Sequence, residues 1–432
     1  LTGDEGFKNS SFKAIIPPKR RRNCYRIDHN QMNIEITRGR SDIYDVLTHL
    51  TFVFIESHKI AHRVVQNNGD VYLKAWKSFE EIISKNKIND KDLQLALLHC
   101  ANIIGRTYEE VLIIHDKAKT VNNPHRFLKT IYWLGKLAID EVERNDNRII
   151  IFSSVLRERL GHHIHGEIWA NNVKNTLRKH NLINRPVHII SANMHSEMNF
   201  LFAKKVIKEK SHEFDKMKTF ELLSDADNIH YYEKIKAYAQ KNGMIFINDD
   251  SGSNIDVQIF DLKKVDFKTS FFTNFEEQKI ERNAVLIVMD YTFGEQVFEV
   301  MDELLKSKLN EVGMNNSLDV ASISIMGKAG CLQGVKGDIV IPTVHIFEGT
   351  SDNYPFKNEL SPEIFDLDGI NVFDGHMITV LGTSLQNKEM LTYFKHSSWG
   401  VTALEMEGAH YQKAIQAASK IRHSISDDVK LR

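Results

Sequence analysis

The sequence predicts an all-helical domain followed by an α/β domain. From about residue 41 to residue 144, apolar residues recur at helical spacing. Near Arg148 the pattern changes to short continuous apolar runs, which are typical of buried strands, and in the last third these runs alternate with helical segments. At 432 residues, the chain is long enough for two or more domains.

The N-terminal part is expected to contain an arm and then the helical domain. Residues 1–40 predict an irregular basic arm, because Pro17-Pro18 and the run Lys19–Arg22 occur without sustained periodicity. We interpret the basic run as a solvated tail rather than a nucleic-acid contact. The helical domain is predicted over residues 41–147, and Ser41-Asp42 is the start signal of its first helix. Further helices are expected over residues 71–84, 91–104 and 123–144.

Residues 148–185 are expected to connect this domain to the α/β domain. The run Ile149–Phe152 predicts a buried strand, and Trp169–Arg178 predicts a helix. A second apolar run at Val187–Ile190 then suggests a β-α-β unit and the beginning of a parallel sheet.

The α/β domain itself is predicted over residues 186–432. Met244–Ile247 and Val257–Phe260 flank the turn-forming Asp249–Ser253 and predict a hairpin. Further strands are expected over residues 284–289, 320–325, 338–342, 376–381 and 402–404, and helices over 294–308, 387–394 and 408–418.

Composition and charge exclude several classes of function. The formal net charge is −1, so no overall field favours nucleic acid or an anionic membrane. No apolar run is long enough to cross a bilayer, and no signal-peptide pattern is present at the N-terminus. The three cysteines, Cys24, Cys100 and Cys331, form no CxxC pattern, which predicts neither a disulfide scaffold nor a thiolate zinc site. We therefore expect a cytoplasmic protein.

The segment Val401–His410 places two carboxylates, Glu405 and Glu407, between a buried strand and the start of a helix. The carboxyl ends of parallel strands face the crevice in which α/β proteins bind ligands. Glu405 is expected to point away from Glu407 and to serve structure.

Three motifs of the last third occur in a particular order. Ser324–Leu332 is a strand end with Gly327 and Gly330 in its exit loop, Val335–Pro342 contains Gly-Asp followed by apolar residues, and Leu404–Ala409 contains Met-Glu-Gly. In this order and spacing they resemble the purine nucleoside phosphorylase and nucleosidase superfamily, over roughly residues 186–432. The resemblance implies a three-layer domain with a mixed sheet, and the preceding helical domain is similar to the plan of the AMP nucleosidases.

The resemblance also implies roles for individual residues. Glu407 is expected to grip the ribose hydroxyls, and Met406 to pack against the sugar. Breaking an N-glycosidic bond develops positive charge on the sugar, so a carboxylate at this position strengthens its hold in the transition state. Gly327, Lys328 and Gly330 are candidate substrate contacts, and the glycines would let backbone amides approach an anion or a ribose oxygen.

Two other loops complete the implied site. After the first strand, Asn193, His195 and Glu197 are candidates, with Glu197 orienting or deprotonating the attacking water. Ser384 and Leu385 occupy the place where the family holds the purine base, although Leu385 replaces an aromatic ring. Gly294 is the one residue retained from the family's glycine-rich turn.

Two departures from the family bear on the reaction. The phosphorylases carry an Arg and a Ser where this chain has Ile325 and Lys328, which favours water over phosphate as the nucleophile. The general acid that protonates the base is either Asp427 or Asp428, after Ser426, or a residue beyond Arg432, which would make the domain incomplete at its C-terminus.

We expect no metal ion and no cofactor. The cluster Gly161–Glu167 and the pair His58 and His62 contain ligand types for a metal, but neither has a third ligand at a supporting spacing. The sequence therefore predicts a nucleosidase that acts on a small purine nucleoside or nucleotide, functioning as a homo-oligomer without nucleic acid or membrane. The alternatives are a phosphorylase and a catalytically inactive nucleotide-sensing protein.

Overall fold

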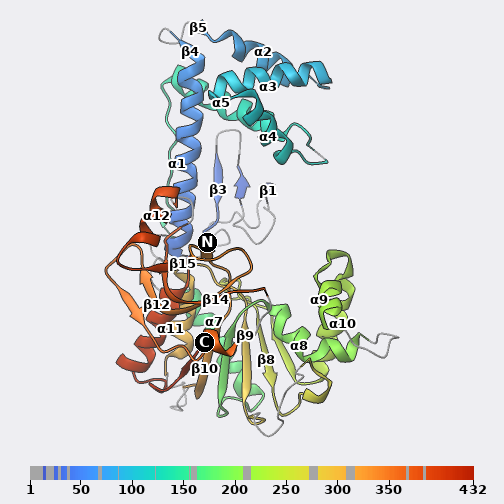
Figure 1. The fold of residues 1–432 in the computed structure, drawn as a ribbon, viewed down its shortest axis with the longest axis vertical. Coiled ribbons are helices and arrows are strands. Elements are labelled where there is room, and N and C mark those ends of the chain that lie inside the picture. The colour runs from blue at the N-terminus through green and yellow to red at the C-terminus, as the bar shows by residue number, and fades with distance from the viewer. Residues whose placement is uncertain are drawn as a thin grey trace. The chain divides into compact units, whose positions relative to one another are not determined.

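The structure is a computed structural model, and its chain divides into two compact units (Figure 1). The larger unit comprises Leu1–Tyr44 and Ser154–Arg432, and the smaller unit comprises Asp45–Ser153. The residues described are 13–15, 24–27, 31–36, 39–66, 71–85, 87–121, 123–154, 156, 163–207, 216–271, 281–307, 317–365, 369–382 and 386–432.

The smaller unit is built mainly of helices. They are α1 (Gly39–Val64, whose first residues belong to the larger unit), α2 (Lys74–Ile83), α3 (Asp90–Ile104), α4 (Tyr108–Ala118) and α5 (Arg126–Arg144). A short hairpin of β4 (Val65–Gln66) and β5 (Val71–Tyr72) follows α1. Trp76, Phe79, Leu97 and Leu128 are buried in the core that these helices share.

Helix α4 is absent from the sequence prediction, although its start signal is present. Thr107 accepts a hydrogen bond from the Glu110 amide, and the Glu110 side chain accepts one from the Thr107 amide, which makes a capping box.

The predicted strand at Ile149–Phe152 is wrong. These residues have no strand partner, and Ile149 and Ile151 are 79% and 84% exposed, because an apolar run forms a buried strand only where a sheet receives it.

The predicted irregular arm is also wrong for its described residues. Strands β1 (Lys13–Ile15), β2 (Cys24–Arg26) and β3 (Met32–Ile34) pair antiparallel in one small sheet. The basic run Lys19–Arg22 lies outside the described residues.

The first sheet of the larger unit has the order β16-β10-β6-β9-β8-β7. Its strands are β6 (Val187–Ser191), β7 (Met244–Ile247), β8 (Val257–Asp261), β9 (Val285–Met289), β10 (Val320–Ile325) and β16 (Lys430–Leu431). The pairs β16-β10, β10-β6 and β6-β9 are parallel, whereas β9-β8 and the predicted hairpin β8-β7 are antiparallel.

Helices cover both faces of this sheet. On one face a core forms with α7 (Ile164–Lys179), α11 (Gln296–Leu305) and α13 (Gly408–Gln416). On the other face a second core forms with α8 (Met194–Val206) and α10 (Ile229–Lys241), next to α9 (Lys216–Ser224) (Figure 1). Alternate residues of β6 serve the two cores, since Ile189 lies in the first and Ile190 packs against the second.

The second sheet has the order β11-β15-β14-β12-β13. Its strands are β11 (Gly330–Cys331), β12 (Ile339–Phe347), β13 (Asn353–Pro355), β14 (Val372–Thr379) and β15 (Val401–Glu405). The pairs β12-β14 and β14-β15 are parallel, and β12 continues five residues beyond the predicted end at Pro342. Helix α12 (Lys388–His396) precedes β15. Single turns complete the described elements at Ala226–Asn228, Phe267–Thr269, Pro362–Ile364 and Ala417–Ile421.

Candidate functional site at the carboxyl ends of the strands

The loops that follow β6, β9 and β15 meet at one edge of the larger unit. The Tyr411 hydroxyl, on α13, donates a hydrogen bond to Ser191 Oγ at the end of β6 (2.5 Å) and lies 3.2 Å from Thr292 Oγ1, just after β9. Burial raises the pKa of Tyr411 to about 12, so its hydroxyl remains a donor. Crevices at the carboxyl ends of such strands are the usual ligand sites of α/β proteins.

Glu405, the last residue of β15, is occupied in holding the start of α13. Its Oε2 accepts hydrogen bonds from the amides of Glu407 and Gly408, each at 2.5 Å, and its Oε1 accepts one from the Thr379 hydroxyl. Thr379 Oγ1 in turn accepts a hydrogen bond from the Ala409 amide (2.8 Å). The first amides of a helix otherwise lack partners, so Glu405 acts as their cap. This is the structural role expected for Glu405.

The environment of Glu405 keeps it ionised. Burial on its own raises the pKa of this carboxyl, but the neighbouring His345 and the hydrogen bonds from Thr379 and Gly408 outweigh burial and lower the pKa below the ordinary value. His345 Nδ1, on β12, lies 3.3 Å from Glu405 Oε1. A Cβ on Gly408 would stand 2.1 Å from the His345 ring, so only glycine leaves room for this pair.

Glu407 has a different set of contacts, although it is only two residues away. It is the residue before the first turn of α13, with φ −128° and ψ −27°. Its Oε1 accepts a hydrogen bond from the Gly294 amide (3.0 Å), in the turn between β9 and α11. Gly294 has φ +54°, a conformation that favours glycine. The turn that resembles the family's glycine-rich loop therefore contacts the carboxylate predicted to bind ribose.

The loop after β6 contributes the predicted Asn193, His195 and Glu197. Asn193 Oδ1 accepts a hydrogen bond from the His195 amide (2.8 Å) and caps α8. The His195 ring packs edge-on against Tyr232 of α10, with ring centroids 4.5 Å apart. Glu197 lies in the first turn of α8, and burial raises the pKa of its carboxyl.

The predicted glycine loop joins β10 to β11. Gly330 pairs with Leu404 of β15, so Gly327 and Lys328 lie at the same edge as Glu405. A Cβ on Gly327 would meet no atom within 4 Å, and Lys328 is exposed. At Gly330 the close neighbour is the Leu404 side chain, 3.1 Å from a built Cβ. Glycine at position 330 is thus accounted for by sheet packing.

The remaining predicted contacts are Met406, Ser384 and Leu385. Met406 packs against the small core of Ile378, Val380, Phe394 and Val401. Ser384 and Leu385 lie outside the described residues.

Asp427 and Asp428 lie at the opposite edge of the first sheet. Lys430–Leu431 form β16, which runs parallel to β10. The two aspartates precede β16 and therefore lie at the amino end of β10, away from Glu407. Neither is placed to protonate a ligand at the carboxyl edge.

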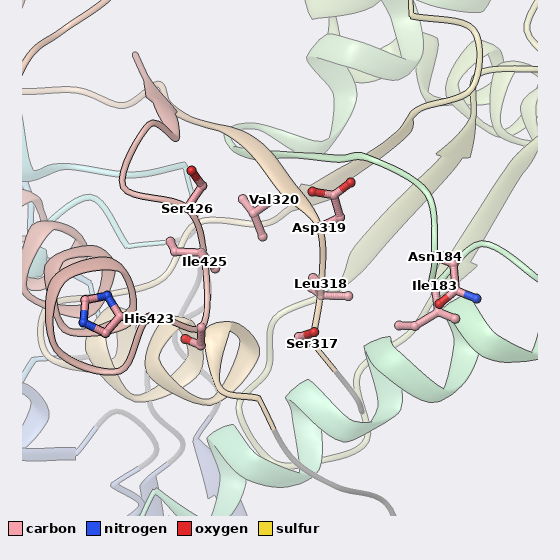
Figure 2. A pocket seen from close by; sticks show the side chains of 10 residues that line it. Ile183, Asn184, Ser317, Leu318, Asp319, Val320, His423, Ile425 and Ser426 are labelled. Atoms are coloured by element: carbon pink, nitrogen blue, oxygen red, sulfur yellow. The ribbon is translucent and has the colours of Figure 1, made fainter. Parts of the chain in front are cut away.

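A cavity of about 530 Å³ opens at this amino edge (Figure 2). It is lined by Ile183 and Asn184 before β6, by Ser317–Val320 at the start of β10, and by His423–Ser426 before β16. None of the predicted site residues lines it.

Within the described residues, His163, Asp302 and Glu303 form one group with the composition of a metal site, their ligand atoms lying within 4.8 Å of one another. Cations already lie on its carboxylates. Lys306 Nζ lies 2.9 Å from Asp302 and 2.5 Å from Glu303, and Arg422 lies 2.7 Å from the other Asp302 oxygen. Two positive charges thus balance two negative ones, and this group is an ion-pair network.

His58, on α1, has a structural explanation. His58 Nε2 lies 3.2 Å from Glu141 Oε2, and Arg148 donates to the other oxygen of the same carboxylate (2.5 Å). Arg148 also donates to Ser57 Oγ (2.9 Å). This network fastens the segment after α5 to α1.

The sequence matches the family of unknown function DUF6909 over residues 3–214 and 217–432. The chain belongs to this family. No curated protein matches it. None of the described helices of this DUF6909 member combines the length and apolar character needed to span a bilayer.

Among solved structures, the DUF6909 chain is similar to nucleosidases at low identity. Futalosine hydrolase of Helicobacter pylori is 13% identical, with 54% of this chain and 82% of that chain covered and a TM-score of 0.30. Helicobacter pylori MTAN is 14% identical, covering 57% and 85% at a TM-score of 0.31. The 5′-methylthioadenosine/S-adenosylhomocysteine nucleosidase of Neisseria meningitidis is 13% identical, covering 54% and 80% at 0.30. At these TM-scores the likenesses carry no argument about the activity of the DUF6909 chain.

Sequence reasoning missed Tyr411, Thr379 and Ser41 at this edge. Tyr411 lies four residues after Glu407, on the same helical face, so helical spacing from Glu407 is a usable signal. Thr379 ends β14, as Glu405 ends β15, and the two are register partners. Ser41 lies 254 residues from its partner Glu295 and has no local signal.

Proposed function

We propose that this chain hydrolyses the N-glycosidic bond of a purine nucleoside or nucleotide and belongs to the nucleoside phosphorylase and nucleosidase superfamily. The observation that carries the proposal is the division of labour between two neighbouring carboxylates. Glu405 caps the start of α13 and lies against His345, whereas Glu407 accepts a hydrogen bond from the Gly294 amide at the carboxyl edge of the strands.

In this proposal Glu407 grips the ribose hydroxyls and Met406 packs against the sugar. As the bond to the base breaks, positive charge develops on the sugar ring, and the nearby carboxylate interacts more strongly with the transition state than with the substrate. Glu407 Oε1 receives one backbone hydrogen bond, so this carboxylate loses little freedom when it binds. Both oxygens of Glu405 already accept hydrogen bonds from the cap of α13 and from Thr379, which supports Glu407 over Glu405.

Glu197 is the proposed base for the attacking water. Burial raises the pKa of its carboxyl, and a base with a pKa closer to neutrality abstracts a proton from water more effectively. Asn193, His195, Gly327, Lys328 and Gly330 are the proposed further contacts to the substrate. Ser384 and Leu385 would contact the base.

Water is favoured over phosphate as the nucleophile. Ile325, at the end of β10, packs against the first core, where a phosphorylase is expected to carry an Arg. Lys328 is exposed and is the remaining cation of the predicted phosphate site, which suits a substrate 5′-phosphate as well as free phosphate. A purine leaves only after it gains a proton from a general acid. We assign this general acid to neither Asp427 nor Asp428, because both lie at the amino edge of the sheet.

The test is release of free base by the full-length chain from AMP, adenosine and inosine, with and without inorganic phosphate. Glu407→Gln should lower kcat/KM by about 100-fold, the loss typical of a preorganised transition-state contact. Glu363→Gln, an exposed glutamate on the turn Pro362–Ile364, is the matched control and should behave as wild type. Turnover only with phosphate would make the chain a phosphorylase.

The competing function is a nucleotide sensor without catalysis. The position of Asp427 and Asp428 at the amino edge favours it. Calorimetric binding of AMP or adenosine by wild type, weakened in Glu407→Gln and without any release of base, would select the sensor. The same proposal includes a homo-oligomeric state, a cytoplasmic location and a preference for AMP. Sedimentation tests the oligomeric state, and a comparison of substrates tests the preference for AMP.

A further inference from the structure

The first turn of α1 contacts the same turn that holds Glu407. Ser41 Oγ accepts a hydrogen bond from the Glu295 amide (2.9 Å), and the preceding amide, that of Gly294, donates to Glu407 Oε1 (3.0 Å). Two adjacent amides of one turn are therefore bound by two side chains that lie far apart in the sequence.

The packing around this turn is close. A Cβ on Gly294 would stand 2.4 Å from Ser41 Oγ, so α1 lies directly against the glycine. Arg40 Nε lies 3.5 Å from Glu295 Oε2. Tyr44, one turn further along α1, lies against Gly382 after β14, where a Cβ would stand 2.7 Å from Tyr44 Cε1. The start of α1 thus touches loops from both sheets of the larger unit.

We propose that Ser41 is a positioning residue for Glu407, and that the first turn of α1 is part of the functional site. Gly294 has φ +54° and no side chain, so the turn has little local restraint of its own. The hydrogen bond from Glu295 to Ser41 fixes the direction of the neighbouring Gly294 amide, and that amide fixes the Glu407 carboxylate. This inference rests on the proposed function, in which Glu407 binds ribose.

The kinetic test compares Ser41→Ala with Ser41→Thr in the full-length chain, using adenosine and AMP. Loss of one such hydrogen bond corresponds to a change of about fivefold to tenfold, so Ser41→Ala should lower kcat/KM by that factor. Ser41→Thr keeps the hydroxyl acceptor and should restore most of the activity. Wild-type kcat/KM in Ser41→Ala would overturn the inference.

A double-mutant comparison separates positioning from general destabilisation. If Ser41 acts through Glu407, Ser41→Ala should have no further effect on kcat/KM in the Glu407→Gln background, while its effect on the melting temperature should be equal in both backgrounds. An undiminished kinetic effect in Glu407→Gln would mean that Ser41 does not act through that carboxylate, and would overturn the inference.

Hydrogen exchange distinguishes failure of the inference from failure of the proposed function. Ser41→Ala should speed amide exchange in the segment Asp290–Gln296, and Ser41→Thr should not. Unchanged exchange in Ser41→Ala overturns the inference whatever the activity is. Faster exchange in a chain whose wild type neither binds nor cleaves adenosine or AMP would instead overturn the proposed function, and the role toward ribose with it.

Discussion

Replacing Glu405 with glutamine should destabilise the larger unit without acting directly on a ligand. The Glu405 side chain is 9% exposed and receives hydrogen bonds from the amides of Glu407 and Gly408 and from the Thr379 hydroxyl, with His345 at 3.3 Å. All of these contacts suit an acceptor that carries negative charge. A glutamine presents an NH₂ group to at least one of the donors.

The magnitude follows from the hydrogen bonds that the substitution disturbs. Hydrogen bonds to charged groups contribute about 1.5 to 3 kcal/mol each, and Glu405 accepts them from the Glu407 and Gly408 amides and from the Thr379 hydroxyl. Since these contributions overlap, we expect a loss of about 4 kcal/mol in the free energy of unfolding. For a unit of this size, such a loss lowers the melting temperature by roughly 6 °C.

Denaturant and thermal unfolding at several pH values test this reasoning. The pKa of Glu405 is lowered in the folded protein, so its contribution is complete above its ordinary value of 4.5 and is lost as pH falls through the lower folded value. The difference between wild type and Glu405→Gln should therefore be constant near neutrality and shrink in acid. A melting temperature equal to that of wild type at pH 7 would refute the assignment of Glu405 as the cap of α13.

Further predictions concern the same region and the ion-pair network of α11. Burial lowers the pKa of His410 to about 4 from 6.5, so the folded protein binds fewer protons than the unfolded chain. Stability should fall by about 3 kcal/mol as pH drops from 6.5 to 4, and urea unfolding of His410→Gln should lack this slope. Gly408→Ala should lower the free energy of unfolding by more than about 3 kcal/mol, because the new Cβ would stand 2.1 Å from the His345 ring. Adding His345→Ala should recover part of that loss. If the losses of the two substitutions are additive, the steric explanation is contradicted. Arg422→Gln should cost about 2 kcal/mol because Asp302 would keep only Lys306, and Asp302→Asn should have a smaller effect in that background than in wild type.

Most of the elements follow from local patterns, and the errors have physical causes. The strands β6, β8 and β9 and helix α7 were predictable because continuous or periodic apolar runs match their buried residues. Ile149–Phe152 has the same composition but no neighbouring strand, and apolar content alone does not reveal whether a sheet edge is available. Strand β16, only two residues long, gains its place by pairing with β10.

The sequence by itself determined that two carboxylates stand between a buried strand and a helix, and that a glycine loop and a polar loop follow other strands. Only the tertiary structure decided which groups each carboxylate contacts. Glu405 meets the free amides of α13 and the ring of His345, 60 residues earlier in the chain, while Glu407 meets Gly294 and, through it, the first turn of α1. The physical reason is that a hydrogen-bond partner distant in the chain leaves no trace in local spacing. The sequence therefore shows which polar side chains stand at the end of a strand. The contacts of each side chain depend on which distant residues the fold places next to it.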